Sequence, residues 1–118
     1  MRKWGRMDGR KLSVKRIGMG LFSKLFGTSV DYAELVKNGA LILDVRTPSE
    51  YSGGHIKGSK NIPLQSLKQQ LGNLPKDRVI ITCCASGMRS ASAKSLLKAE
   101  GWKEVHNGGG WTSLKNKL

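Results

Sequence analysis

The sequence has few cysteines, few prolines and no long apolar run. Its two cysteines, Cys83 and Cys84, are adjacent, so they cannot cross-link distant parts of a fold. Two thiols are also too few for a structural zinc site unless His55 and His106 converge on them, and we expect no metal. No stretch approaches the roughly 18 apolar residues that cross a bilayer. These absences argue against a disulfide-built fold and predict a reactive thiol in a reducing compartment, which we expect to be the cytoplasm.

Acidic residues are scarce as well, with 8 Asp and Glu against 21 Lys and Arg, for a net charge of +13. Residues 1–27 hold eight of the basic residues and one acidic residue, and five glycines there disfavour a long helix. Broken apolar runs in this stretch do not fit a secretory signal. We therefore predict a poorly ordered basic N-terminal tail, residues 1–27, followed by one domain, residues 28–118. Contact of the tail with an anionic membrane surface is the less favoured alternative.

Apolar runs alternate with helical patterns along the predicted domain, which is typical of an α/β fold with a parallel sheet between helices. A serine/threonine-x-x-glutamate pattern at residues 47–50, with proline second, predicts a capping box. Strands are predicted at 41–45, 60–63, 78–82 and 104–107, and helices at 31–38, 64–71, 89–99 and 111–114.

The segment around Cys84 carries the most chemical information. A buried strand is predicted to run into this thiol, and the following helix would point its N-terminus at the sulfur. Because unpaired amides there carry partial positive charge, and Arg89 adds a cation, the thiol is expected to ionise at neutral pH. The amides of residues 85–89 are expected to converge on the sulfur, with Gly87 turning the chain at positive φ. Ligands of parallel sheets bind at this edge, where the strands end.

Four stretches resemble the motifs of single-domain rhodaneses, in the same order along the chain. They are residues 43–51 (LDVRTPSEY), 54–63 (GHIKGSKNIP), 84–90 (CASGMRS) and 107–111 (NGGGW). The resemblance implies a rhodanese-like three-layer fold, a short parallel sheet with helices on both faces. It also implies a sulfurtransferase without a cofactor. Such an enzyme takes a sulfane sulfur from thiosulfate or a similar donor onto a cysteine and passes it to cyanide or a thiol.

The roles that the resemblance implies are specific. Cys84 would be the nucleophile that becomes a persulfide. Arg89 would attract the anionic group of the donor, or alternatively clamp the loop. Asp44 and Arg46 would support the site, as a buried ion pair rather than as chemical groups. Substrate contacts through the loop backbone are expected from Ala85, Ser86, Gly87 and Met88.

The partners expected for such a site are a small anionic sulfur donor and a cyanide or thiol acceptor. A sulfur-carrier protein or a thioredoxin-like protein would also fit as acceptor. The basic composition lacks the interleaved aromatic and basic residues typical of nucleic-acid binding, so no nucleic-acid partner is expected. His55 is expected to be structural.

Cys83 leaves two questions open. Neighbouring residues on a strand point to opposite faces, so Cys83 is expected to face the core, although a resolving thiol is the alternative. The spacing from Cys83 to Arg89 also matches cysteine phosphatases, but Thr82 replaces the histidine of that pattern, and the glycine falls where rhodaneses have it. The remaining alternative is a non-catalytic binding or regulatory module on the same fold.

Overall fold

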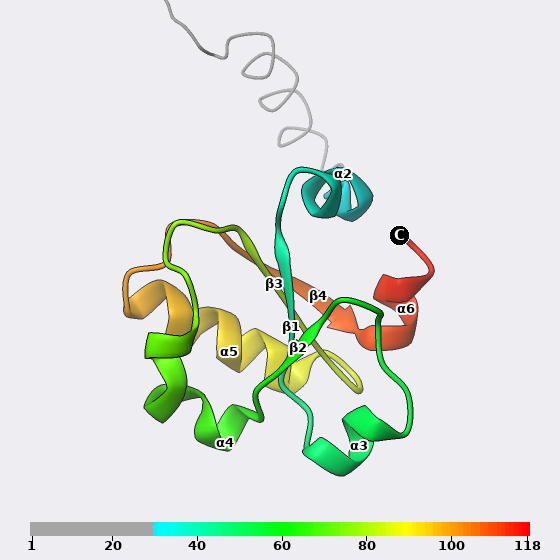
Figure 1. Ribbon diagram of the computed structural model, residues 1–118, viewed down its shortest axis with the longest axis horizontal. Coiled ribbons are helices and arrows are strands. Elements are labelled where there is room, and N and C mark those ends of the chain that lie inside the picture. Colours follow the sequence, from blue (N-terminus) through cyan, green and yellow to red (C-terminus); the bar gives the residue numbers. More distant parts are fainter. Residues whose placement is uncertain (1–29) are drawn as a thin grey trace, which may run out of the picture. The chain divides into compact units, whose positions relative to one another are not determined.

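The computed structural model describes residues 30–118 of the chain. The basic N-terminal tail, with its predicted lack of order and its alternative of membrane contact, lies outside the described residues. Within them, a four-stranded parallel sheet has the strand order β2-β1-β3-β4 (Figure 1). The strands are β1 (Leu41–Asp44), β2 (Lys60–Asn61), β3 (Ile80–Cys84) and β4 (Val105–Gly110).

Helices cover both faces of this sheet. The α5 face is covered by α4 (Leu64–Leu67), the 3-10 helix η1 (Lys68–Asn73) and α5 (Met88–Ala99). The α6 face is covered by α2 (Tyr32–Lys37) and α6 (Trp111–Lys115). A short helix, α3 (Pro48–Ser52), follows the carboxyl end of β1. The predicted three-layer α/β arrangement is confirmed.

The core consists of two apolar clusters, one on each face of the sheet. Because side chains alternate along a strand, β3 contributes to both. Ile80 and Cys84 pack in the cluster under α5, whereas Ile81 and Cys83 pack in the cluster under α6. The predicted inward position of Cys83 is therefore confirmed, and the two thiols face opposite layers.

The strand that carries the thiols ends later than the sequence indicated. β3 runs to Cys84 rather than stopping at Thr82, because both cysteine positions keep backbone partners in the sheet. Cys83 lies opposite Asp44 of β1, and Cys84 lies opposite Gly110 of β4 beyond a register shift. Cys84 is thus held by the sheet itself, as the last residue of a strand.

The glycine run at the end of β4 belongs to the strand, although the sequence indicated only a connection there. A Cβ at Gly108 would lie 2.9 Å from the carbonyl oxygen of Thr82. A Cβ at Gly110 would lie 2.9 Å from the carbonyl oxygen of Ala85. Glycine is needed because the backbone of β4 approaches β3 and the following loop too closely for a side chain.

Two helices also differ from their predicted limits. The helix expected at 64–71 is α-helical only to Leu67 and continues as η1, where Gln70 has non-helical angles of φ −113° and ψ 18°. Gly72, a poor helix former, follows within the same segment. The helix after the thiol begins at Met88, one residue before its predicted start.

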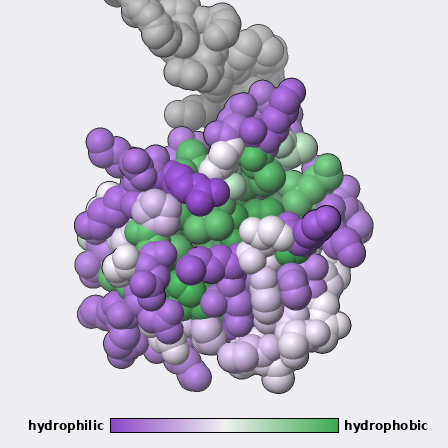
Figure 2. Space-filling view, viewed as in Figure 1, coloured by the Kyte–Doolittle hydropathy of each residue, from purple (hydrophilic) through white to green (hydrophobic). Residues whose placement is uncertain are grey.

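The sheet edge at β2 is short. On the side of the molecule seen in Figure 2, hydrophilic residues surround a smaller hydrophobic area. A two-residue edge strand in such surroundings offers little template for pairing with another chain. Among residues 30–118, no helix is long and apolar enough to span a bilayer.

Candidate active site

A three-residue loop, residues 85–87, joins the end of β3 to the start of α5. Gly87 is the N-cap residue of α5 and has φ 107°, in the left-handed region that glycine adopts without strain. This confirms the predicted positive φ. The turn directs the backbone amides of the loop and the first turn of α5 back towards Cys84.

The sulfur of Cys84 lies inside this turn. The amide of Gly87 donates to Sγ at 3.0 Å, and the amide of Ser90 donates at 3.3 Å. The Ser90 hydroxyl is 3.4 Å from Sγ. Of the amides of residues 85–89 that were predicted to converge on the sulfur, the one that donates to Sγ here is that of Gly87, and the second donor, Ser90, was not predicted. The signal available was a serine within one helical turn of a predicted N-terminus.

These contacts control the ionisation of the thiol. Burial is the largest single influence and raises the pKa of Cys84. Hydrogen bonds from the Ser90 side chain and from the backbone of Ser90, Gly87 and Ser86 together outweigh burial, so the net pKa is lowered. A thiolate is therefore favoured by donors that point at it, as a helix N-terminus provides.

Cys84 is nevertheless covered. Its side chain has 0% exposure, although Ala85 and Ser86 beside it are exposed. Met88, the first residue of α5, is 79% exposed. The exposed residues next to the sulfur therefore belong to loop 85–87 and the start of α5, whereas Cys84 itself packs in the core cluster under α5.

Asn107 of β4 makes hydrogen bonds to Ser90 and to loop 85–87. The Ser90 hydroxyl donates to Asn107 Oδ1 at 2.6 Å, and Asn107 Nδ2 donates to the Gly87 carbonyl at 3.3 Å. The amide of Gly109 donates to the same Oδ1 at 2.9 Å. Because Ser90 has one hydroxyl proton, it can donate to Asn107 or to a thiolate at Cys84, but not to both at once. Asn107 keeps the Gly109 bond in either case.

Arg89 is paired with a carboxylate. Its Nη1 and Nη2 donate to Glu50 Oε1 and Oε2 at 2.8 and 3.0 Å. The hydrogen bond from Arg89, followed by the one from the Thr47 backbone, lowers the pKa of Glu50 to about 2. The pair joins α5 to α3, which is the clamp geometry that the sequence left as an alternative to donor binding. Glu50 was identified by sequence only as part of the predicted capping box, which the structure confirms.

Asp44 and Arg46 form a buried ion pair beneath the site. Arg46 Nη2 lies 2.7 Å from Asp44 Oδ2, and Nε donates to both carboxylate oxygens. The same guanidinium donates to the carbonyls of Gly54 at 2.8 Å and Glu50 at 3.2 Å. Its carbon lies 4.7 Å from the centre of the Trp111 ring. The pair therefore holds α3 and the loop after it against the end of β1.

Cys83 has a different environment from its neighbour. It has 0% exposure in the cluster under α6. Burial, followed by the nearby negative charge of Asp44, raises the pKa of Cys83 to about 12. A thiol in this state remains protonated at neutral pH and is a poor nucleophile.

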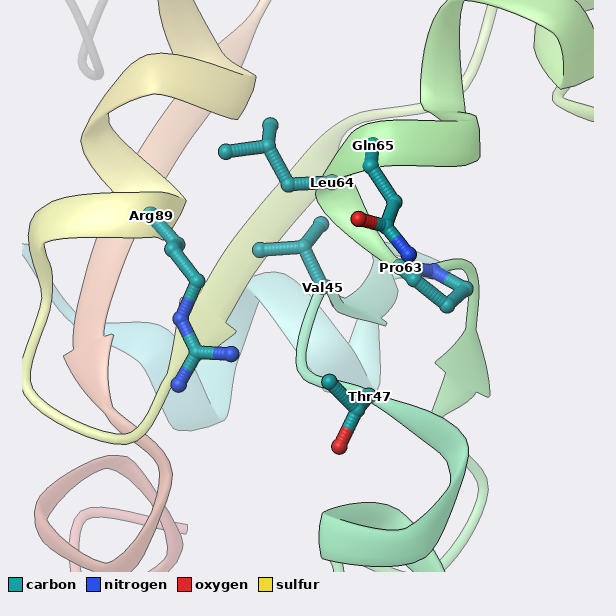
Figure 3. Close-up of a pocket in the computed structure, with 6 residues that line it drawn as sticks. All are labelled: Val45, Thr47, Pro63, Leu64, Gln65 and Arg89. Carbon is teal, nitrogen blue, oxygen red and sulfur yellow. The ribbon is translucent and has the colours of Figure 1, made fainter.

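A cavity of about 210 Å³ opens beside Arg89 on the α5 face. Figure 3 shows the side chains of Val45 and Leu64 pointing towards Arg89, with Thr47 below them. Val45 and Cys84 belong to the same core cluster, so the cavity lies on the face of the sheet to which Cys84 points. Its walls are completed by Pro63 and Gln65.

The two histidines contact other parts of the domain. His55 Nδ1 is 2.8 Å from the Tyr51 carbonyl oxygen, and its ring stacks on Tyr51 at 3.8 Å. His106 Nε2 is 2.8 Å from Glu104 Oε2. In the part of the chain that the structure describes, no three His, Cys, Asp or Glu side chains are grouped so as to hold a metal ion.

Comparisons with known proteins agree with this geometry. The family model of the rhodanese-like domain matches residues 28–117. The thiosulfate sulfurtransferase GlpE of Ectopseudomonas mendocina is 35% identical over 74 residues, which cover 63% of this chain and 68% of GlpE. YqhL of Bacillus subtilis, an uncharacterised protein, is 40% identical over 68 residues. That match covers 58% of this chain and 54% of YqhL, so the chain spans little more than half of this relative.

A solved structure is similar over most of the domain. The crystal structure of a rhodanese-related protein from Thermoplasma volcanium matches with a TM-score of 0.64 at 35% identity. The match covers 75% of this chain and 91% of that protein. The predicted family and the predicted fold are both confirmed by these similarities.

Proposed function

The chain belongs to the rhodanese-like domain family, and on this basis we propose that it is a sulfurtransferase that works through a persulfide on Cys84. The observation that carries the proposal is the sulfur of Cys84, which accepts hydrogen bonds from the amides of Gly87 and Ser90 at the end of a parallel strand. The same environment that stabilises a thiolate stabilises a persulfide anion. The names of the relatives support the reaction class.

The first half-reaction transfers sulfur to the protein. The Cys84 thiolate attacks the outer sulfur of thiosulfate, a new S–S bond forms, and the bond within the donor breaks. The electron pair of that bond leaves with sulfite, so the protein gains one sulfur atom and keeps one negative charge. The Ser90 hydroxyl turns from Asn107 towards the anion, and the loop amides hold the terminal sulfur.

The second half-reaction restores the enzyme. Cyanide or a thiolate attacks the terminal sulfur, and the Cys84–sulfur bond breaks with its electron pair returning to Cys84. Thiocyanate or a new persulfide leaves. A sulfur-carrier or thioredoxin-like protein would supply its thiolate in the same way. The cycle needs no external oxidant, because the sulfane sulfur moves between nucleophiles.

Two further features support this function. The covered position of Cys84 protects a persulfide from stray thiols, and loop 85–87 would open to admit the donor and the acceptor. Both cysteines are free, and a reactive free thiol suits a reducing compartment, so a cytoplasmic location is part of the proposal.

Cyanolysis tests the proposal. The protein is incubated with thiosulfate, separated from it and treated with cyanide, and thiocyanate is measured for the wild type, Cys84→Ala and Cys83→Ala. We expect release from the wild type and from Cys83→Ala, and background release from Cys84→Ala. Equal release from the wild type and Cys84→Ala would contradict the proposed function.

The complete burial of Cys84 favours one competing function, a binding module that does not transfer sulfur. That module would keep loop 85–87 closed. A folded wild type that gains no sulfur from thiosulfate, and whose Cys84 resists iodoacetamide for hours, would support the module. A phosphatase centred on Cys83 finds no such support, since the pKa of Cys83 is raised to about 12 in the opposite core layer.

A further inference from the structure

Glu50 is paired with Arg89, the cation that an anionic donor would otherwise bind. The flat guanidinium of Arg89 donates from both terminal nitrogens to both carboxylate oxygens, at 2.8 and 3.0 Å. This bidentate arrangement uses the donors that Arg89 would otherwise offer to a sulfonate or thiosulfate group. The side chains are 36% and 35% exposed, so an incoming anion can reach the pair and compete for it.

Glu50 is fixed in this position by the start of α3. Thr47 donates its amide to Glu50 Oε1 at 2.9 Å, and Glu50 donates its amide to Thr47 Oγ1 at 3.3 Å. A carboxylate held by a capping box loses little further freedom when it pairs with Arg89. With a pKa of about 2, Glu50 is charged at every pH at which the thiol could act.

The pair is also close to the reacting sulfur. Arg89 immediately precedes Ser90, whose amide donates to Cys84 Sγ at 3.3 Å. The charge on Cys84 raises the pKa of Arg89 in turn, after the larger effect of Glu50. Arg89 also lines the cavity on the nucleophile's side of the sheet, opposite Val45 and Leu64 (Figure 3). An anion seated there would meet Arg89 and its carboxylate together.

We propose that Glu50 is a specificity-determining residue that makes the enzyme discriminate against small dianionic donors. The inference rests on the proposed sulfur transfer and deepens it. A dianion such as thiosulfate must displace the carboxylate from Arg89 and is repelled by it. A donor with a single negative charge is attracted less by Arg89 and repelled less by Glu50. Donors of lower charge are therefore favoured relative to thiosulfate.

Glu50→Gln tests this role. A glutamine oxygen can still accept from the Thr47 amide, so the capping box is kept while the charge is removed. The rate of sulfur addition to Cys84 is followed by intact mass, with thiosulfate and with a monoanionic aromatic thiosulfonate. We expect the rate with thiosulfate to rise about threefold to tenfold, and the rate with the thiosulfonate to rise by about twofold or less.

Glu100→Gln is the matched control, because it makes the same change of net charge at an exposed position at the far end of α5. It should leave both rates unchanged. Equal gains in Glu50→Gln and Glu100→Gln would overturn the inference, since general electrostatics would then explain them. Equal gains with the two donors would overturn it as well.

A second measurement separates this inference from the proposed function. Cys84 is alkylated with anionic iodoacetate and with neutral iodoacetamide, and the modified peptide is identified by mass. Glu50→Gln should raise the ratio of the two rates about threefold, and Arg89→Gln should lower it below the wild-type value. A changed ratio without any sulfur addition keeps the anion selection and rejects the transferase. Intact sulfur addition with an unchanged ratio keeps the transferase and rejects the anion selection by Glu50.

Discussion

Cys83 and Cys84 are consecutive residues with opposite chemistry. Both have 0% exposure, so access to solvent does not distinguish them in the closed structure. Cys84 faces α5 and receives hydrogen bonds from Gly87 and Ser90, and its pKa is lowered despite burial. Cys83 faces α6 among apolar side chains, and its pKa is raised to about 12. The comparison teaches that hydrogen-bond donors directed at the sulfur outweigh burial at Cys84, whereas burial dominates at Cys83.

The largest expected effect is the difference in reactivity between the two thiols. Because the pKa of Cys83 is raised to about 12 and that of Cys84 is lowered from 9.0, the thiolate fraction of Cys84 at neutral pH should be higher by about 10³-fold or more. A lower pKa also reduces intrinsic nucleophilicity, which leaves an advantage of about 30-fold or more. Iodoacetamide labelling with peptide mass analysis should measure it. In denaturant the two rates should converge, and a persistent difference there would contradict this explanation.

Two glycines of β4 separately test the packing against β3 and the packing against the loop that follows it. Gly108→Ala places a Cβ 2.9 Å from the Thr82 carbonyl oxygen, so the free energy of unfolding should fall by about 1–3 kcal/mol. Gly110→Ala places one 2.9 Å from the Ala85 carbonyl oxygen and should also change the alkylation rate of Cys84.

Urea denaturation and iodoacetamide labelling measure these two effects. Gly72→Ala is the control, because nothing lies within 4 Å of its Cβ and it should leave stability and labelling nearly unchanged. If Gly110→Ala left the labelling of Cys84 unchanged, the loop would not depend on the close approach of β4.

Ser90→Ala removes the hydroxyl next to the Cys84 sulfur. Without this donor the thiolate is less favoured, so the pKa of Cys84 should rise and sulfur addition at neutral pH should slow about tenfold. At high pH the variant should approach the wild-type rate, because ionisation is then complete in both. Ser92→Ala, at an exposed position of the same helix, should behave like the wild type. A loss that is the same at every pH would indicate a structural role instead.

The smallest expected effect is on stability in acid. Because the folded pKa of Glu50 is about 2, below its ordinary value of 4.5, the ion pair with Arg89 contributes fully above pH 4.5. The contribution is lost as the pH falls from about 4.5 to about 2. Both side chains are partly exposed, so the effect should be small. Urea midpoints against pH should fall less steeply for Glu50→Gln than for Glu100→Gln.

The sequence predicted the elements of the fold more successfully than their limits. Alternation of apolar strands with helices gave the parallel sheet and the opposite directions of Cys83 and Cys84, because side-chain direction in a strand depends on local geometry alone. The end of β3 was predicted too early. The glycines of β4 were not recognised as part of a strand. Glycine is needed there because β3 and the following loop approach closely, and such an approach is not visible in the local sequence.

The loop geometry predicted around Cys84 is confirmed, whereas the contacts that this loop makes with distant segments were not predicted. The loop, its thiol and the left-handed Gly87 follow from consecutive residues. Glu50 is 39 positions from Arg89 in sequence, and Asn107 is 17 positions from Ser90. Such partners meet only when different strands of the sheet end side by side, so no local pattern could identify them.

The sequence by itself determined a strand, a tight turn and a helix that together surround one sulfur with amide donors. That arrangement is local, because a left-handed glycine and a helix N-terminus need only a few consecutive residues. Tertiary structure alone decided that Cys84 is covered, that the Ser90 hydroxyl donates to Asn107, and that Glu50 pairs with Arg89. These features join segments that are distant along the chain, and they exist only once the sheet has assembled.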